Sequence, residues 1–144
     1  MTRQEFKKIA TLRLIEAESL LHQNHYDGSC YLAGYCLELA LKAVICRRME
    51  KDDFFDILKS ESVRSFKIHN LTELVILAGL QKRYEDLKAI NPDFEYNWVV
   101  IRDKIRWSEQ LRYQTGFTKS DAESMLNAIN DPQNGILKWL KKYW

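Results

Sequence analysis

The chain has 144 residues, of which 46% are hydrophobic and 29% are charged, and its formal net charge is +2. These values fit one soluble globular domain, residues 1–144, that is long enough to bury a core. The small net charge excludes any argument for a nucleic-acid partner from overall charge, so local clusters of basic residues must supply that argument.

The N-terminal residues predict a helix rather than a targeting segment. No apolar run at the start resembles a signal peptide, and we therefore expect a cytoplasmic protein. Thr2 and Glu5 have the spacing of a capping box, and apolar residues recur after them at helical spacing up to about Asn24. A turn at Tyr26–Gly28 then leads into the next helix.

The stretch from about 28 to 48 is predicted to be a buried central helix. Between Ser29 and Cys46, only Glu38 and Lys42 interrupt a run of apolar, aromatic and small residues. A helix that is apolar on every side lies inside a protein, and two central charges argue against a membrane span. Glu38 and Lys42 are four positions apart, so they can form an ion pair on one face.

Metal and disulfide sites are not predicted. The three cysteines all fall on the central helix, at Cys30, Cys36 and Cys46. Their odd number and spacing favour buried free thiols in a reducing compartment. His22 and His25 have a spacing that could ligate a metal, but Asp27 is the single weak candidate for a further ligand nearby. We therefore expect neither a metal nor a cofactor.

The middle of the chain predicts short helices. One is expected at about 54–58, followed by a loop. Asn70 and Glu73 have capping-box spacing and open a helix that is brief or bent near Gly79. A further helix over 82–90 should stop before Pro92, because the residue that precedes proline avoids the α region.

The last third predicts a helix over 94–106, a loop rich in aromatic and basic residues over 107–117, and a final helix that starts at Ser120. Asp131-Pro132 could cap and restart a helix. No stretch alternates as a β-strand does. The expected fold is therefore all-α, an up-and-down antiparallel bundle of four to five main helices around the central helix.

Three segments resemble the HEPN domains of bacteria and archaea: Tyr26–Ala43 (YDGSCYLAGYCLELALKA), His69–Leu74 (HNLTEL) and Trp107–Tyr113 (WSEQLRY). The resemblance implies a helical bundle that is often a homodimer. It also implies an association with minimal nucleotidyltransferases in toxin–antitoxin pairs and other defence systems. Many members are metal-independent RNases, whereas others are inactive binding or dimerisation domains.

The RNase members carry an Arg followed by a His after four to six intervening residues, and Arg64 and His69 match the shortest spacing. A histidine can move a proton to or from a ribose 2′-hydroxyl at neutral pH. An arginine can hold the scissile phosphate and stabilise its charge. The alternative is structural: His69 packs on the core where a helix begins, and Arg64 is a solvated loop residue.

Glu38 is also expected to be structural. The resemblance implies that it pairs with Arg112 of the late loop, with Lys42 competing for the same carboxylate. The alternative places these charges in a cleft for a ligand or phosphate. Candidate residues for contact with RNA or a nucleotide are Lys42, Arg106, Trp107, Arg112 and Tyr113, although Asp103 and Glu109 weaken the positive field around the late segment.

Two functions remain open from the sequence. The first is a metal-independent endoribonuclease that acts on RNA in a toxin–antitoxin or defence setting. The second is a non-catalytic module that dimerises and binds a nucleotide or a separate nucleotidyltransferase protein. They differ in the state of His69, which must be exposed for catalysis and buried with both ring nitrogens satisfied for a purely structural role.

Overall fold

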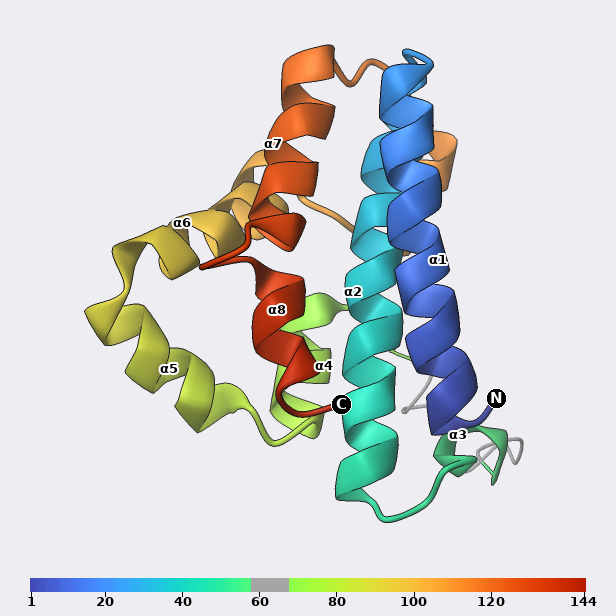
Figure 1. The fold of residues 1–144 in the computed structure, drawn as a ribbon, viewed down its shortest axis with the longest axis vertical. Helices are drawn as coiled ribbons and strands as arrows, with labels where there is room; N and C mark the ends of the chain where they lie inside the picture. Colours follow the sequence, from blue (N-terminus) through green and yellow to red (C-terminus); the bar gives the residue numbers. More distant parts are fainter. Residues whose placement is uncertain (58–67) are drawn as a thin grey trace.

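The computed structural model describes residues 1–57 and 68–144, which form helices and no strand (Figure 1). In chain order the helices are α1 (Arg3–His22), α2 (Tyr26–Arg48), α3 (Phe54–Ile57), α4 (Leu71–Leu77), α5 (Gln81–Ile90), α6 (Pro92–Val99), the π-helix η2 (Val100–Lys104), the 3-10 helix η3 (Glu109–Tyr113), α7 (Lys119–Asn130) and α8 (Ile136–Lys141). The all-α class expected from the sequence is confirmed.

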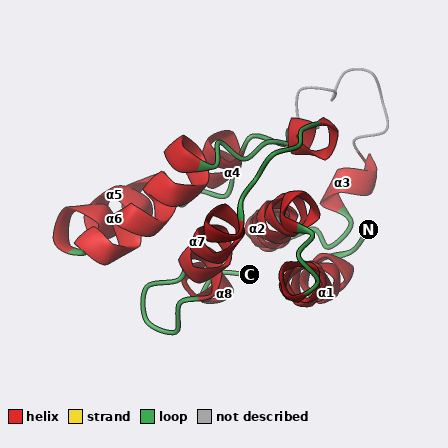
Figure 2. Ribbon diagram, turned by 90° about the horizontal axis from the view of Figure 1, so that it is seen from above, coloured by secondary structure: helices red, strands yellow, loops and turns green. Residues whose placement is uncertain are grey.

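Helices α1 and α2 form a long antiparallel pair (Figures 1 and 2). The predicted capping box starts α1: the Thr2 hydroxyl accepts from the Glu5 backbone N–H at 3.3 Å, and the Glu5 carboxylate accepts from the Thr2 N–H at 2.7 Å. The chain reverses at Asn24, which has a φ of +63°. Asparagine tolerates this left-handed conformation better than most residues.

Helix α2 is the core helix of the protein. Its most apolar window would be long enough to cross a membrane, but 78% of that window is buried inside the protein. Helix α1 covers one side of α2, and α7 and α8 pack against another side (Figure 2). The buried polar side chains of the described residues are Ser29, which donates to the Ala17 carbonyl at 2.8 Å, and Glu38.

The three cysteines are free and buried on α2. Burial disfavours the charged thiolate and raises the pKa of Cys30 and of Cys36 to about 12. Burial likewise raises the pKa of Cys46. The thiols therefore behave as small apolar groups of the core rather than as nucleophiles.

Aromatic rings join the outlying helices α5 and α6 to the end of the chain. Phe94 and Trp98 of α6 both meet the ring of Trp139 of α8 edge to face, at centroid distances of 5.3 and 6.5 Å. Tyr84 of α5 approaches Trp98 in the same way, at 5.8 Å. This edge-to-face geometry is the favoured one for aromatic pairs, and it fixes α5 and α6 beside the bundle.

Several expected boundaries differ in the last third, where the predicted loop over 107–117 also contains the 3-10 helix η3. The predicted single helix over 94–106 is divided between α6 and the π-helix η2, and α6 begins at Pro92. Asp131-Pro132 does not start a helix, because the Asp131 carboxylate accepts from the backbone N–H groups of Gln133 and Asn134 and closes a turn. Helix α8 begins only at Ile136.

Candidate functional site

Glu38 lies in the middle of α2, and its side chain is fully buried. Lys42, one turn later, places its Nζ 2.6 Å from Glu38 Oε1, so the predicted ion pair is confirmed. The Lys42 ammonium also lies 5.7 Å from the centre of the Phe55 ring of α3. A buried carboxylate is costly without partners, and Lys42 supplies one of them.

His69 supplies the second partner of Glu38. Its Nδ1 lies 3.0 Å from Oε1 and 3.1 Å from Oε2 of the Glu38 carboxylate. The next residue, Asn70, is the N-cap of α4: its side-chain oxygen accepts from the Glu73 backbone N–H at 3.0 Å. This cap sets the direction in which the chain enters α4, and it thereby holds His69 against the middle of α2.

The geometry assigns different roles to the two ring nitrogens of His69. An ionised carboxylate only accepts hydrogen bonds, so Nδ1 donates its proton to Glu38 and Nε2 is left for another group. The side chain is 39% exposed, so the ring is not enclosed by the core. A histidine oriented by a buried carboxylate in this way is an arrangement that acid–base catalysts use.

Arg64, the predicted partner of His69, lies outside the described residues. Arg112, the other predicted partner, does lie within them, and the expected Glu38–Arg112 bridge is wrong. Glu38 is occupied by Lys42 and His69, whereas the exposed Arg112 guanidinium lies 4.8 Å from the centre of the Tyr113 ring. Tyr113 is itself 73% exposed, so this pair faces solvent at the end of η3.

Trp107, predicted to contact nucleic acid, is a packing residue in this structure. It is 8% exposed, and its indole N–H donates to the Tyr31 carbonyl of α2 at 2.9 Å. A Cβ at Gly34 would lie 2.2 Å from the indole ring, so the ring packs directly on the backbone of α2. The ring is therefore not free to stack on a base, because its faces and its N–H are already engaged.

Arg106 is exposed and lines a pocket of about 280 Å³. Asn70, the residue after His69, lines the same pocket. Its φ of +54° is unusual for a residue other than glycine. The other residues that line this pocket are Leu71, Thr72, Trp98, Ile101, Arg102 and Trp107. Arg106, one of the cations predicted to bind nucleic acid, thus shares a pocket with the residue next to His69. The sequence did not indicate this pocket.

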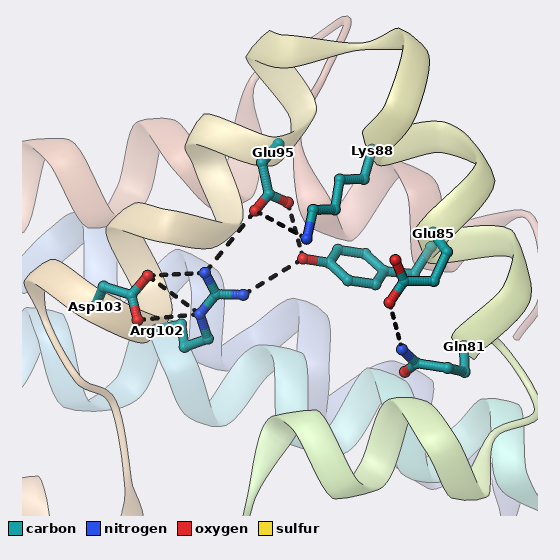
Figure 3. Close-up of polar contacts among 7 residues, drawn as sticks. Gln81, Glu85, Lys88, Glu95, Arg102 and Asp103 are labelled. Atoms are coloured by element: carbon teal, nitrogen blue, oxygen red, sulfur yellow. Dashed lines mark hydrogen bonds and ion pairs between the residues drawn. The ribbon is translucent and has the colours of Figure 1, made fainter.

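On the side of α5, a charged network lines a neighbouring pocket of about 180 Å³, which shares Thr72, Trp98 and Arg102 with the first (Figure 3). Arg102 of η2 pairs with Asp103 at 2.8 Å and with Glu95 at 3.8 Å, and its guanidinium donates to the Tyr84 hydroxyl at 3.4 Å. The Tyr84 hydroxyl in turn donates to Glu95 at 2.8 Å.

Burial, together with the neighbouring Glu95 carboxylate, raises the pKa of Tyr84 to about 12. The charges of this network largely neutralise one another. The sequence did not single out these residues, because their partners come from three different helices.

No group of three or more His, Cys, Asp or Glu side chains that could hold a metal ion occurs among residues 1–57 and 68–144. The elements around Glu38 can instead hold and orient a proton-transfer group. They can also present the positive charge of Arg106 and Arg112 to an anion nearby.

Comparison with known proteins bears on the first two helices. Residues 4–53, which include nearly all of α1 and the whole of α2, match the family model described as the HEPN domain. No curated protein and no solved structure matches the chain. The resemblance expected from the sequence is confirmed: the segment that carries Glu38 and Lys42 matches the HEPN domain.

Proposed function

We propose that this HEPN-family protein is a metal-independent endoribonuclease in which His69 is the general acid/base. The contact between the buried Glu38 carboxylate and His69 Nδ1 is the observation that carries the proposal. It leaves Nε2 of a partly exposed imidazole to take the proton of a ribose 2′-hydroxyl. The 2′-oxygen then attacks the adjacent phosphorus, the bond to the 5′-oxygen breaks, and the leaving oxygen takes up a proton from solvent, to which His69 returns the proton that it accepted.

Cations near His69 support an anionic substrate. In this proposal Arg64 holds the scissile phosphate, and Arg106 and Arg112 contact neighbouring phosphates. Arg106 lines the hollow that adjoins Asn70, which would accommodate the nucleotide next to the one that is cleaved. Trp107 packs on α2, so in this proposal it forms part of the wall of the hollow rather than a platform on which a base stacks.

We place this activity in the cytoplasm, in a toxin–antitoxin or defence setting, with a homodimer as the working unit and a nucleotidyltransferase as a partner protein. Light scattering coupled to size-exclusion chromatography tests the dimer. A mass near twice 17.1 kDa is expected. A single-chain mass across the concentration range would rule the dimer out.

The second candidate is a non-catalytic interaction module, favoured by the fact that Lys42 and His69 both bond the same buried carboxylate. On this alternative, the contacts of Glu38 with Lys42 and His69 tie the start of α4 to α2 and have no chemical role. Substitution of Glu38 or His69 would then change the stability of the protein, and the wild type would show no RNA cleavage.

The deciding experiment is cleavage of an end-labelled mixed-sequence RNA in excess EDTA. Wild type is compared with His69→Ala, Glu38→Gln and the control His22→Ala, which removes an exposed histidine at the end of α1. Cleavage that His22→Ala retains and His69→Ala loses is expected, with Glu38→Gln impaired because Nδ1 loses its charged acceptor. Equal background in wild type and in the folded His69→Ala variant would refute the RNase and favour the interaction module.

A further inference from the structure

A second hollow, of about 390 Å³, lies where α2 ends, α5 begins and α8 ends, and it is lined by Arg47, Arg48, Glu50, Arg83, Lys142 and Tyr143. Four of these side chains are cationic and one is anionic. The end of α8, beside the letter C in Figure 1, lies next to the lower part of α2. The volume lies within the range of sites that bind small molecules.

Three cations of this hollow lack the ion pairs that neutralise several basic residues elsewhere in the described structure. Lys119 of α7, for example, lies 3.7 Å from Glu123, and Lys104 lies 4.0 Å from Asp121. By contrast, Arg48, Arg83 and Lys142 form no ion pair with any residue in 1–57 or 68–144. Their positive charge is therefore available to a ligand.

Helix dipoles account for only part of this cluster. Arg48 closes α2 and Lys142 follows the last residue of α8, positions where a cation is favourable because the C-terminal end of a helix is negative. Arg83 differs, since it lies in the first turn of α5, where a cation is unfavourable. Its presence beside the other cations points to a function other than stabilising its own helix.

Tyr143 fixes the geometry of the hollow. The Arg83 guanidinium lies 5.4 Å from the centre of the Tyr143 ring, and Arg47 Nη1 donates to the Tyr143 carbonyl at 3.3 Å. A guanidinium held against a ring keeps its N–H edge available for a phosphate oxygen. The hollow thus has one arginine committed to structure and a second that is oriented by an aromatic ring.

This hollow is separate from the His69 site. Arg47 comes nine residues after Glu38 on the same helix. An α-helix rises about 1.5 Å and turns about 100° per residue, so the two positions lie about 13 Å apart along α2 and on opposite sides of it. A ligand in the hollow would therefore contact a different face of the bundle from one at His69.

We propose that this hollow binds consecutive phosphate groups, either in the backbone of an RNA strand or in a free polyphosphate. Arg48, Arg83 and Lys142 contact the phosphate oxygens, and Arg47 and Tyr143 hold the hollow open. The proposal does not depend on cleavage at His69, because it requires only binding.

The test is fluorescence polarisation with a labelled 2′-O-methyl RNA, which lacks the hydroxyl needed for cleavage. The triple variant Arg48→Ala, Arg83→Ala and Lys142→Ala is compared with a control of equal charge loss, Lys104→Ala, Lys119→Ala and Lys138→Ala. The first triple variant should weaken binding at least about tenfold. It should also make the slope of log K against log salt shallower by about 2, since each phosphate contact on a single strand contributes about 0.7.

Inorganic triphosphate is added as a competitor to identify the source of the phosphates. Displacement of the RNA by triphosphate would assign the hollow to free polyphosphates as well as RNA, and binding without displacement would assign it to RNA alone. Equal losses in the two triple variants, or no loss in either, would overturn the proposal. The single variant Lys142→Ala and circular dichroism separate lost binding from lost folding.

Discussion

The Glu38 cluster, formed by Glu38, Lys42 and His69, and the network around Arg102 are both built from ion pairs and hydrogen bonds, but they differ in their exposure to water. In each, a charged side chain on a helix bonds one residue close to it in sequence and another that is distant. The Glu38 side chain is fully buried and that of Lys42 is 13% exposed. In the Arg102 network, the Arg102 and Asp103 side chains are 42% and 54% exposed (Figure 3).

This difference in exposure decides what each set of charges contributes. Water competes for the Arg102 network and screens it, so its pairs add little to the free energy of unfolding. The Glu38 carboxylate has no access to water, so it depends on Lys42 and His69 for compensation. Three substitutions test this comparison and a fourth tests the packing of Trp107; they are ordered from the largest expected effect to the smallest.

Glu38→Ala should lower the free energy of unfolding by about 3–5 kcal/mol, because it leaves a mostly buried Lys42 without its partner. Urea unfolding followed by circular dichroism measures the change. Glu123→Ala on α7 is the control, since it removes an exposed partner of Lys119 at the same helical spacing. A loss as small as that of the control would show that Lys42 and His69 find water once Glu38 is gone.

Gly34→Ala should cost about 1–3 kcal/mol, because the added Cβ would lie 2.2 Å from the Trp107 ring and would force it off α2. The shift of tryptophan fluorescence and the unfolding midpoint measure it. Gly28→Ala on the same helix is the control, since its Cβ would meet only a movable Leu20 methyl at 3.1 Å. Equal stability of the two variants would contradict the close packing of Trp107.

Glu95→Gln should cost no more than about 1 kcal/mol, because the amide keeps the hydrogen bond to Tyr84 and loses only long, partly exposed ion pairs to Lys88 and Arg102. The difference from wild type should vanish in high salt, whereas that of Glu38→Ala should persist. Unfolding in low and high salt measures both. A Glu95→Gln cost that salt leaves unchanged would show that the network behaves as a buried one.

Asp103→Asn should have the smallest effect, and that effect should depend on pH. The hydrogen bonds from Arg102 hold the pKa of Asp103 below its ordinary value. The folded state therefore resists protonation more than the unfolded chain does, so the stabilisation is present above the ordinary pKa and is lost as pH falls through the lowered one. The thermal unfolding midpoints of the variant and of wild type should differ at neutral pH and converge in acid. A difference between the two midpoints that instead grows in acid would contradict a lowered pKa of Asp103 in the folded state.

Local patterns predicted the helices well where the signal and the structure are both local. The Thr2–Glu5 box and the apolar run of α2 depend on residues within a few turns, and both elements form, although α2 begins at Tyr26, where a turn was predicted. The start of α7 shows the limit of this approach. Ser120 and Glu123 have capping-box spacing, but the box forms at Thr118 and Asp121, because the extended backbone lies at Thr118.

The partners of Glu38 show why the site was harder to predict. Lys42 is one helical turn away, so spacing alone predicted the pair. His69 and Arg112 were both candidate residues on later segments, and either could have reached a carboxylate on α2. Only the tertiary path through the Asn70 cap decides that His69 does so.

The buried thiols of α2 offer a built-in reporter of motion. Cys30, Cys36 and Cys46 lie along the length of the core helix, and their high pKa keeps them protonated while they are enclosed. An alkylating reagent therefore reacts with them only when the helices around α2 separate. The labelling rate of each thiol would report the opening of the helices around a different position along α2, with no engineered probe.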